Sequence, residues 1–297
     1  MSLEKMFHLK ENNTTVKTEI MAGVTSFMTM AYILAVNPNI LAAAGMDHGA
    51  VFTATAVASF IGTLCMALFA NYPFALAPGM GLNAYFAYTV VLGMGYSWEV
   101  ALAAVLTEGI IFIILSCFNI REAIFNAIPF NLKKAVSVGI GLFITFLGLQ
   151  NAKIVIGGAT LVGLFSVDGY NKTLADGLTA SMSDAGITVL LAIFGVLITG
   201  ILIVKNVKGN ILWGILITWI LGIICQFAGI YIPNPDLGFY NLLPDFSNGI
   251  SIPSLAPIMF KFSLKGVPVL EFIIIVFAFL FVDLFDTLGT LIGVSAK

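Results

Sequence analysis

Two long stretches without a charged residue constrain this chain more than any other feature. Asp, Glu, Lys and Arg are absent from Ile20 to Met46 and again from His48 to Trp98. A helix needs about 20 apolar residues to cross the ~30 Å hydrocarbon core of a bilayer. Only 9% of the 297 residues are charged, against about 25% in soluble domains. We therefore expect an all-α polytopic membrane protein whose main solvent is the lipid bilayer.

The same length criterion, applied along the whole chain, predicts eight spans. Two long polar connections, 152–184 and 230–268, lie after the fifth and the seventh span. The expected spans cover approximately residues 20–41, 51–70, 75–92, 100–118, 134–151, 186–204, 210–229 and 269–292.

Positive charge predicts the orientation, because Lys and Arg gather in cytoplasmic loops. With the N-terminus inside, the inner segments hold Lys5, Lys10, Lys17, Arg121, Lys133, Lys134, Lys205 and Lys208, whereas the outer connections hold Lys153, Lys172, Lys261 and Lys265. Residues 1–19 lack the apolar core of a cleaved signal. We expect a multi-pass protein of the cell membrane with a cytoplasmic N-terminal tail over residues 1–19.

The third span breaks the rules for a lipid-facing helix. Pro78, Gly79 and Gly81 fall close together in it, and each weakens a helix. Non-helical backbone at membrane depth survives only against protein or a water-filled cavity. One interpretation is an extended half over 74–81 and a half-helix from near Asn83, the arrangement in which transporters bind substrates. The alternative is a proline-kinked helix whose glycines allow close packing.

The eighth span carries two acidic residues on one face. Asp283 and Asp286 are three residues apart, and Asp283 lies about 21 Å along the helix axis from the start of the span. One mid-membrane aspartate costs about 2.5–3.5 kcal/mol on insertion scales, so both should face protein or water and are functional candidates. The alternative for Asp286 is a capping or pairing role near the inner interface.

Glu108 lies at the centre of the fourth span. It is either a proton carrier or a structural glutamate that is hydrogen-bonded between helices, and the sequence leaves both open. A carboxylate in a membrane can bind a proton on one side and release it on the other, which is the basis of proton-coupled transport.

Several function classes are disfavoured. The net charge of −2 and the lack of clustered Lys and Arg disfavour nucleic acid as a partner. The two histidines, His8 and His48, lie outside the apolar runs, so we expect no metal, no cofactor and no catalytic residue. Three alternatives to a transporter of a small polar solute remain: an anion transporter, a membrane-embedded metal-dependent enzyme that uses Asp283 and Asp286, and a non-transporting structural protein. Two carboxylates are few for a metal site, and they would repel an anion.

Four stretches resemble AzgA-type purine permeases, a branch of the nucleobase–cation symporters. The first, Gly23 to Pro38, reads GVTSFMTMAYILAVNP. The others are ALAPGMGLNAYFAY from Ala75 to Tyr88, VDLFDTLGTL from Val282 to Leu291, and the run from Pro129 to Gln150. The resemblance covers the whole chain, with several motifs in the same order.

The resemblance implies a UraA-like 7+7 inverted-repeat transporter fold, with a short strand and a half-helix in the third span. It implies core-domain spans 1–4 over 20–120, gate-domain spans 5–7 over 121–229, an extracellular connection over 230–268 and core-domain span 8 over 269–297. The substrate is then a purine (adenine, guanine or hypoxanthine), imported with H⁺ or Na⁺. Asn83, Gly81 and Asp283, with Asp286 as second choice, would bind it, while Asp283, Asp286 and Glu108 would carry the proton.

Family members continue for six more spans, which include the partner of the Asn83 segment. The resemblance therefore implies a C-terminally truncated chain with only the first span of the second repeat, and an incomplete substrate site. A homodimer is left open.

Overall fold

A computed structural model describes residues 6–118, 129–158, 160–174, 177–243 and 251–295. The chain forms two compact units. The first consists of residues 1–31 and 145–251, and the second of residues 32–144 and 252–297. Two of these boundaries fall within the expected first and fifth spans and the third within the expected 230–268 connection, so they differ from the expected core and gate boundaries. The core and gate roles stay predictions.

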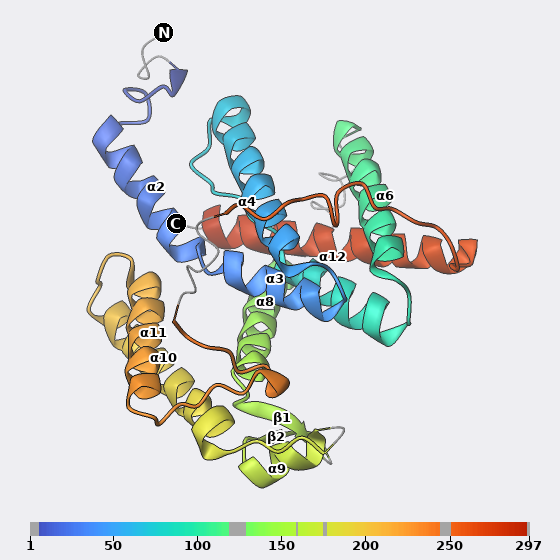
Figure 1. The fold of residues 1–297 in the computed structure, drawn as a ribbon. Coiled ribbons are helices and arrows are strands. Elements are labelled where there is room, and N and C mark those ends of the chain that lie inside the picture. Colours follow the sequence, from blue (N-terminus) through green and yellow to red (C-terminus); the bar gives the residue numbers. More distant parts are fainter. Residues whose placement is uncertain (1–5, 119–128, 159, 175–176, 244–250, 296–297) are drawn as a thin grey trace. The chain divides into compact units, whose positions relative to one another are not determined.

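The second unit contains the helices around the candidate site (Figure 1). The helices α3 (Ile33–Ala43) and α4 (His48–Cys65) are joined by a tight turn, and Asp47 caps α4 by accepting a hydrogen bond from the Ala50 N–H at 2.7 Å. The chain then forms the π-helix η1 (Met66–Ala70), helix α5 (Met80–Ala84), π-helix η2 (Tyr85–Gly93), α6 (Trp98–Cys117) and α12 (Val269–Ser295). Helix α8 (Phe130–Asn151) crosses the boundary between the two units.

The first unit begins with α2 (Val16–Met30). Its polar part holds the antiparallel strands β1 (Val155–Gly158) and β2 (Leu161–Leu164), in which Val155 pairs with Leu164, followed by α9 (Val167–Thr173). The π-helix η3 (Met182–Gly186), α10 (Ile187–Val204), α11 (Asn210–Phe227) and the 3₁₀ turn η4 (Pro235–Leu237) follow. The expectation of an all-α fold is therefore right for the mainly helical architecture and wrong for this short hairpin, which lies between the expected spans.

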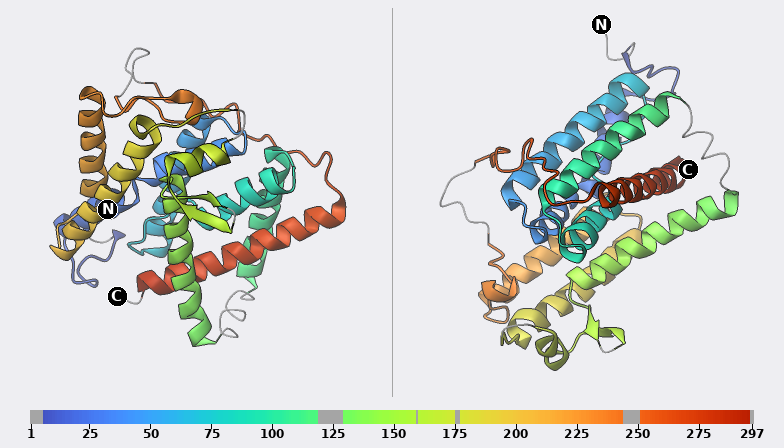
Figure 2. Two further views of the ribbon diagram at one scale, coloured as in Figure 1. Left: turned by 90° about the horizontal axis from the view of Figure 1, so that it is seen from below. Right: turned by 90° about the vertical axis from the view of Figure 1, so that its right-hand side faces the viewer.

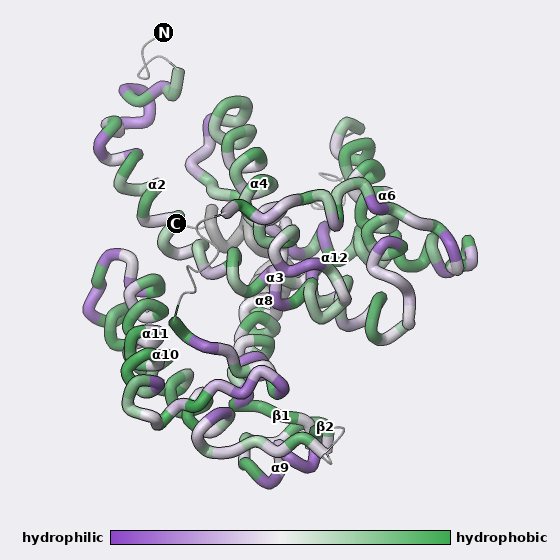
Figure 3. Tube along the Cα trace, viewed as in Figure 1, coloured by the Kyte–Doolittle hydropathy of each residue, from purple (hydrophilic) through white to green (hydrophobic). Residues whose placement is uncertain are grey.

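Five helical segments are long and apolar enough to cross a membrane, judged over the described residues. They are Val16–Ala43, His48–Ala70, Trp98–Cys117, Met182–Val204 and Asn210–Phe227, and Figure 3 shows the apolar character of α4, α6, α10 and α11. A multi-pass membrane protein is thereby supported. The fifth and eighth expected spans coincide with the helices α8 and α12, parts of which lie outside the described residues, and the third is divided between the short elements α5 and η2. The eight-span topology stays a prediction.

The two apolar helices of the first unit pack through small residues. A Cβ on Gly195 of α10 would overlap Thr218 of α11, and a Cβ on Gly214 of α11 would overlap Thr199 of α10. Each threonine donates its hydroxyl hydrogen to the carbonyl four residues earlier in its own helix, both at 2.7 Å. Reciprocal Gly–Thr contacts let two helices approach closely where lipid gives no hydrophobic driving force.

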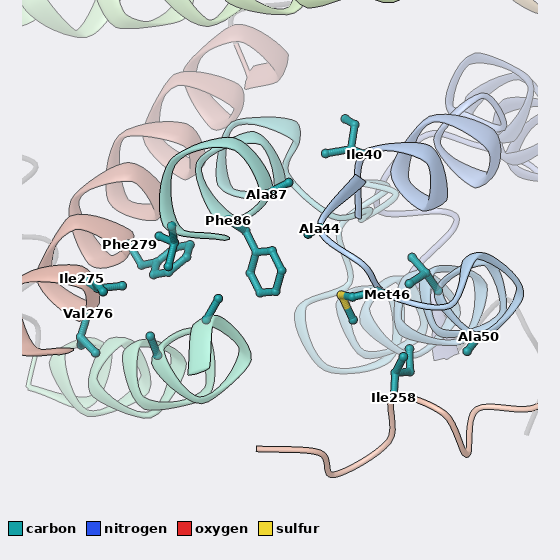
Figure 4. Close-up of a cluster of buried hydrophobic side chains, with 14 residues drawn as sticks. Ile40, Ala44, Met46, Ala50, Phe86, Ala87, Ile258, Ile275, Val276 and Phe279 are labelled. Atoms are coloured by element: carbon teal, nitrogen blue, oxygen red, sulfur yellow. The ribbon is translucent and has the colours of Figure 1, made fainter. Parts of the chain in front are cut away.

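The core of the second unit joins α12 to segments from the first third of the chain. Phe279 of α12 is fully buried and lies edge-on to Tyr85, with ring centroids 4.9 Å apart and planes at 86°. Figure 4 shows Phe279, Ile275 and Val276 of α12 together with Phe86. The buried cluster comprises Ile40, Ala44, Met46, Ala50, Val51, Phe86, Ala87, Val90, Ala101, Ala104, Ile258, Ile275, Val276 and Phe279.

The connection before α12 is held to the same unit. The Thr53 hydroxyl of α4 donates to the Pro253 carbonyl at 2.9 Å, and the Ser263 N–H donates to the Glu99 carbonyl at 3.3 Å. Helix α12 is the long red helix in Figure 2, and its range includes both Asp283 and Asp286. Lys5 and Arg121, on which the orientation argument partly depends, lie outside the described residues, so the cytoplasmic N-terminus stays a prediction.

Candidate functional site

The third span is broken where the sequence places its proline and glycines. Residues 71–79 form neither helix nor strand, and α5 begins at Met80 with Gly79 as its N-cap. The predicted start near Asn83 is wrong by three residues: the Asn83 N–H already donates to the Gly79 carbonyl at 3.2 Å, so Asn83 lies inside the helix. Asn83 is therefore a side-chain donor and acceptor within the first turns, and not a cap.

The non-helical segment is held by a side chain instead of a second strand. Thr63 of α4 accepts a hydrogen bond from the Leu76 N–H at 2.9 Å and approaches the Leu76 carbonyl at 3.3 Å. A strand needs a neighbouring strand for its backbone groups, and residues 71–79 have none among the described segments. The expected short strand is therefore not formed. Thr63 instead satisfies the backbone groups of Leu76 in this segment, as a membrane interior requires.

Asp286 of α12 lies against the break. A Cβ on Gly79 would overlap Asp286 Oδ2, whereas a Cβ on Gly81 would meet Val282 Cγ1 at an ordinary 3.8 Å. The absence of a side chain at residue 79 is therefore what admits the carboxylate. One turn of helix away, Asp283 Oδ1 lies 3.4 Å from the Thr287 hydroxyl. The structure thus brings the acidic face of α12 to the start of α5.

Asn83 is tied to two buried polar side chains. Its Nδ2 donates to Asn37 Oδ1 at 2.6 Å, and Asn37 Nδ2 donates to Thr55 Oγ1 at 2.7 Å. Asn37 and Thr55 are 4% and 2% exposed. Pro38, which follows Asn37 directly, lies inside α3, and the helix continues to Ala43.

Glu108 of α6 is also a buried polar residue of this unit. Its side chain is 4% exposed, and Oε1 has no hydrogen-bond partner in the described part of the chain. Asp283 acts on it electrostatically, as it does on Asp286. The unpartnered Oε1 leaves both interpretations, a proton carrier and a structural glutamate hydrogen-bonded between helices, as predictions.

A family comparison identifies the group of proteins to which these residues belong. The family model described as the permease family matches residues 17–296. The chain belongs to the permease family. The expectation of a permease and not an enzyme is thereby confirmed at the level of the family.

Individual permeases extend this finding. The chain is 42% identical to the guanine/hypoxanthine permease PbuO of Bacillus subtilis over 98% of its own length and 62% of that protein. It is 42% identical to the guanine/hypoxanthine permease PbuG of the same organism, over 99% and 63%. It is 38% identical to the adenine permease AdeP of Escherichia coli, over 99% and 59%. The resemblance to purine permeases is confirmed, and the chain spans about three fifths of the length of these relatives.

Within this permease chain, one unit contains every candidate site residue predicted from the sequence. Asn83, Gly79, Gly81 and Pro78 lie at the break, Asp283 and Asp286 on α12, and Glu108 on α6. Sequence reasoning missed Thr63, Asn37 and Thr55 as parts of this group. The local signal for these three residues was that each is polar and lies in a charge-free run. A threonine in such a run can equally bond its hydroxyl back to its own helix.

Proposed function

We propose that the complete protein containing this chain is a secondary active transporter. It imports a purine nucleobase such as guanine, hypoxanthine or adenine by proton symport, with alternating access of one site to the two sides of the cell membrane. The substrate assignment draws on the relatives, two of which are guanine/hypoxanthine permeases and one an adenine permease by name. The N-terminus lies in the cytoplasm in this proposal.

The observation that carries the proposal is the contact between Asp286 and the break in the third span. A carboxylate next to irregular backbone is tolerated at membrane depth where the site holds water or a polar ligand. Asp283 and Asp286 offer acceptors to the ring N–H groups of a purine, and the Asn83 amide offers both a donor and an acceptor. Two negative neighbours at this place disfavour an anion as the substrate.

The acidic residues also support proton coupling. Glu108, Asp283 and Asp286 are three carboxyl groups in one unit, and the charge of Asp283 acts on each of the other two. Placing several negative charges together in a membrane is costly, so binding a proton to the group relieves repulsion and changes the charge that a substrate meets. We therefore assign the coupling ion as H⁺, with Na⁺ as the alternative.

Reconstituted transport tests this function. The complete protein in proteoliposomes is given radiolabelled guanine, hypoxanthine and adenine under an inward proton gradient, an inward sodium gradient or no gradient. We expect accumulation above equilibrium with the proton gradient, and its loss on adding a protonophore. Accumulation driven by sodium alone would replace the proton by Na⁺, and no saturable uptake of any purine would refute the substrate assignment. Competition by small inorganic anions would instead indicate the anion carrier.

A further inference from the structure

A continuous chain of hydrogen bonds leads from a helix backbone to Asn83. The Thr55 hydroxyl donates to the Val51 carbonyl at 2.8 Å and accepts from Asn37 Nδ2 at 2.7 Å, and Asn37 Oδ1 accepts from Asn83 Nδ2 at 2.6 Å. The residues come from α4, α3 and α5. The Asn37–Thr55 bond joins residues 18 positions apart in the sequence, and the Asn83–Asn37 bond joins residues 46 positions apart. Both inner members are almost completely buried, so water does not compete for these bonds.

The Val51 carbonyl, at one end of this series, fixes the direction of every hydrogen bond in it. A carbonyl can only accept, so the Thr55 hydroxyl uses its single hydrogen on Val51 and can only accept from Asn37. Asn37 must therefore direct its NH₂ group to Thr55 and its oxygen to Asn83. Asn83 in turn must direct its NH₂ group to Asn37. The orientation of the Asn83 amide is thus determined by the Thr55 hydroxyl, which lies two hydrogen bonds away from it. A flipped amide would place two donors or two acceptors face to face.

The oxygen of Asn83 is left for another group. It accepts no hydrogen bond from the described residues, and Asn83 is only partly buried, at the turn that carries Gly79 and Gly81. We propose that Asn37 and Thr55 are positioning residues that hold the Asn83 amide with its oxygen presented to the substrate. This inference rests on the proposed function, and it specifies the ligand further: the atom that meets Asn83 carries an N–H donor, so a nucleobase methylated at that nitrogen is rejected.

A double-mutant cycle tests whether Thr55 acts through Asn83. Purine affinity is measured by radioligand binding to the complete protein, with and without Thr55→Val, in the native background and in Asn83→Ala. We expect Thr55→Val to weaken binding about tenfold in the native background, the size of one orienting hydrogen bond, and less than about twofold in Asn83→Ala, since coupled residues are not additive. An equal loss in both backgrounds would overturn the proposal.

Two further variants separate positioning from packing. Thr55→Ser keeps the hydroxyl and should retain native affinity and native rejection of N-methylated purines, whereas Thr55→Val should lose part of that rejection. Thr107→Val is the matched control, because the Thr107 hydroxyl also donates to the carbonyl four residues back, that of Ala103, at 2.8 Å. It should behave as the native protein. A Thr55→Ser variant as impaired as Thr55→Val would contradict the proposal.

A measurement without ligand tests the hydrogen-bonded series from Thr55 through Asn37 to Asn83 independently of the substrate assignment. The same four proteins of the cycle are compared by thermal unfolding without purine. The proposal requires the losses in Tm from Thr55→Val and Asn83→Ala to be less than additive, because either change breaks the same chain of bonds. Additive losses in Tm would overturn the proposal that Thr55 positions Asn83, even if purines bind. Absence of purine binding with non-additive Tm losses would instead refute only the proposed substrate.

Discussion

The carboxylate of Asp286 occupies the space that a side chain on Gly79 would need. Gly79 is the residue at which the third span turns from irregular backbone into helix, and Asp286 belongs to the eighth span. One missing Cβ therefore lets an acidic group from a distant part of the sequence reach the break.

Gly79→Ala should displace the Asp286 carboxylate, because the new methyl group overlaps Oδ2. Overpacking of this kind costs about 1–3 kcal/mol, so we expect a lower Tm and the loss of most purine uptake. Gly200→Ala is the control, since a Cβ there meets nothing within 4 Å. Native uptake in Gly79→Ala would show that the position of Asp286 at the break does not matter for transport.

Glu108→Gln should leave the fold intact and change the pH dependence of uptake. Glutamine has the same shape as glutamate but cannot carry a negative charge. It replaces a buried carboxyl group whose Oε1 has no partner among the described residues. We expect an unchanged or higher Tm, and uptake that no longer responds to an inward proton gradient. Reconstituted uptake between acidic and alkaline pH measures this, and a native pH profile would remove Glu108 from proton coupling.

Asp184→Asn provides a contrast within the first unit. Asp184 is as buried as Glu108, at 4% exposed, but both of its oxygens are used. Oδ1 accepts from the Ser181 N–H at 2.6 Å and also from the Ala185 N–H, and Oδ2 accepts from Asn234 Nδ2 at 3.2 Å. Bonds to a charged acceptor contribute about 1.5–3 kcal/mol each, so neutralising Asp184 should lower the Tm and leave the pH profile unchanged. A higher Tm would contradict this assignment.

Thr63→Val should destabilise the irregular part of the third span. The valine matches threonine in shape but can neither accept from the Leu76 N–H nor bond its carbonyl. Each unsatisfied backbone group costs about 1–3 kcal/mol. We expect a clear fall in Tm and faster hydrogen exchange around Leu76, while Thr63→Ser should keep both close to native. Equal behaviour of the two variants would mean that the hydroxyl does not hold this segment.

Asp283→Asn should abolish uptake or uncouple it from the proton gradient, since this carboxyl group acts on both Glu108 and Asp286. Asp168→Asn, at an exposed position in the first turn of α9, is the control and should transport normally. The measurement is purine uptake at several external pH values. Unchanged, pH-dependent transport in Asp283→Asn would exclude this residue from the mechanism.

The difference between expectation and structure is clearest at Asn37 and Asn83. An Asn-Pro pair is a local signal for the end of a helix, and Asn is a preferred N-cap. In the structure both asparagines lie inside helices, α3 and α5, and bond to each other. The local rules describe how a short polar side chain satisfies its own backbone. They fail where another segment supplies the partner.

The sequence alone determined the helical segments, the break near Pro78 and Gly79, and the membership of a permease family. Hydropathy and helix propensity act over neighbouring residues and add along the chain, so they can be read without coordinates. Only the tertiary structure decided that Thr63 bonds Leu76, that Asp286 reaches Gly79, and that Thr55 and Asn37 orient Asn83. These contacts depend on the rotation and depth of packed helices, for which the sequence carries no local pattern.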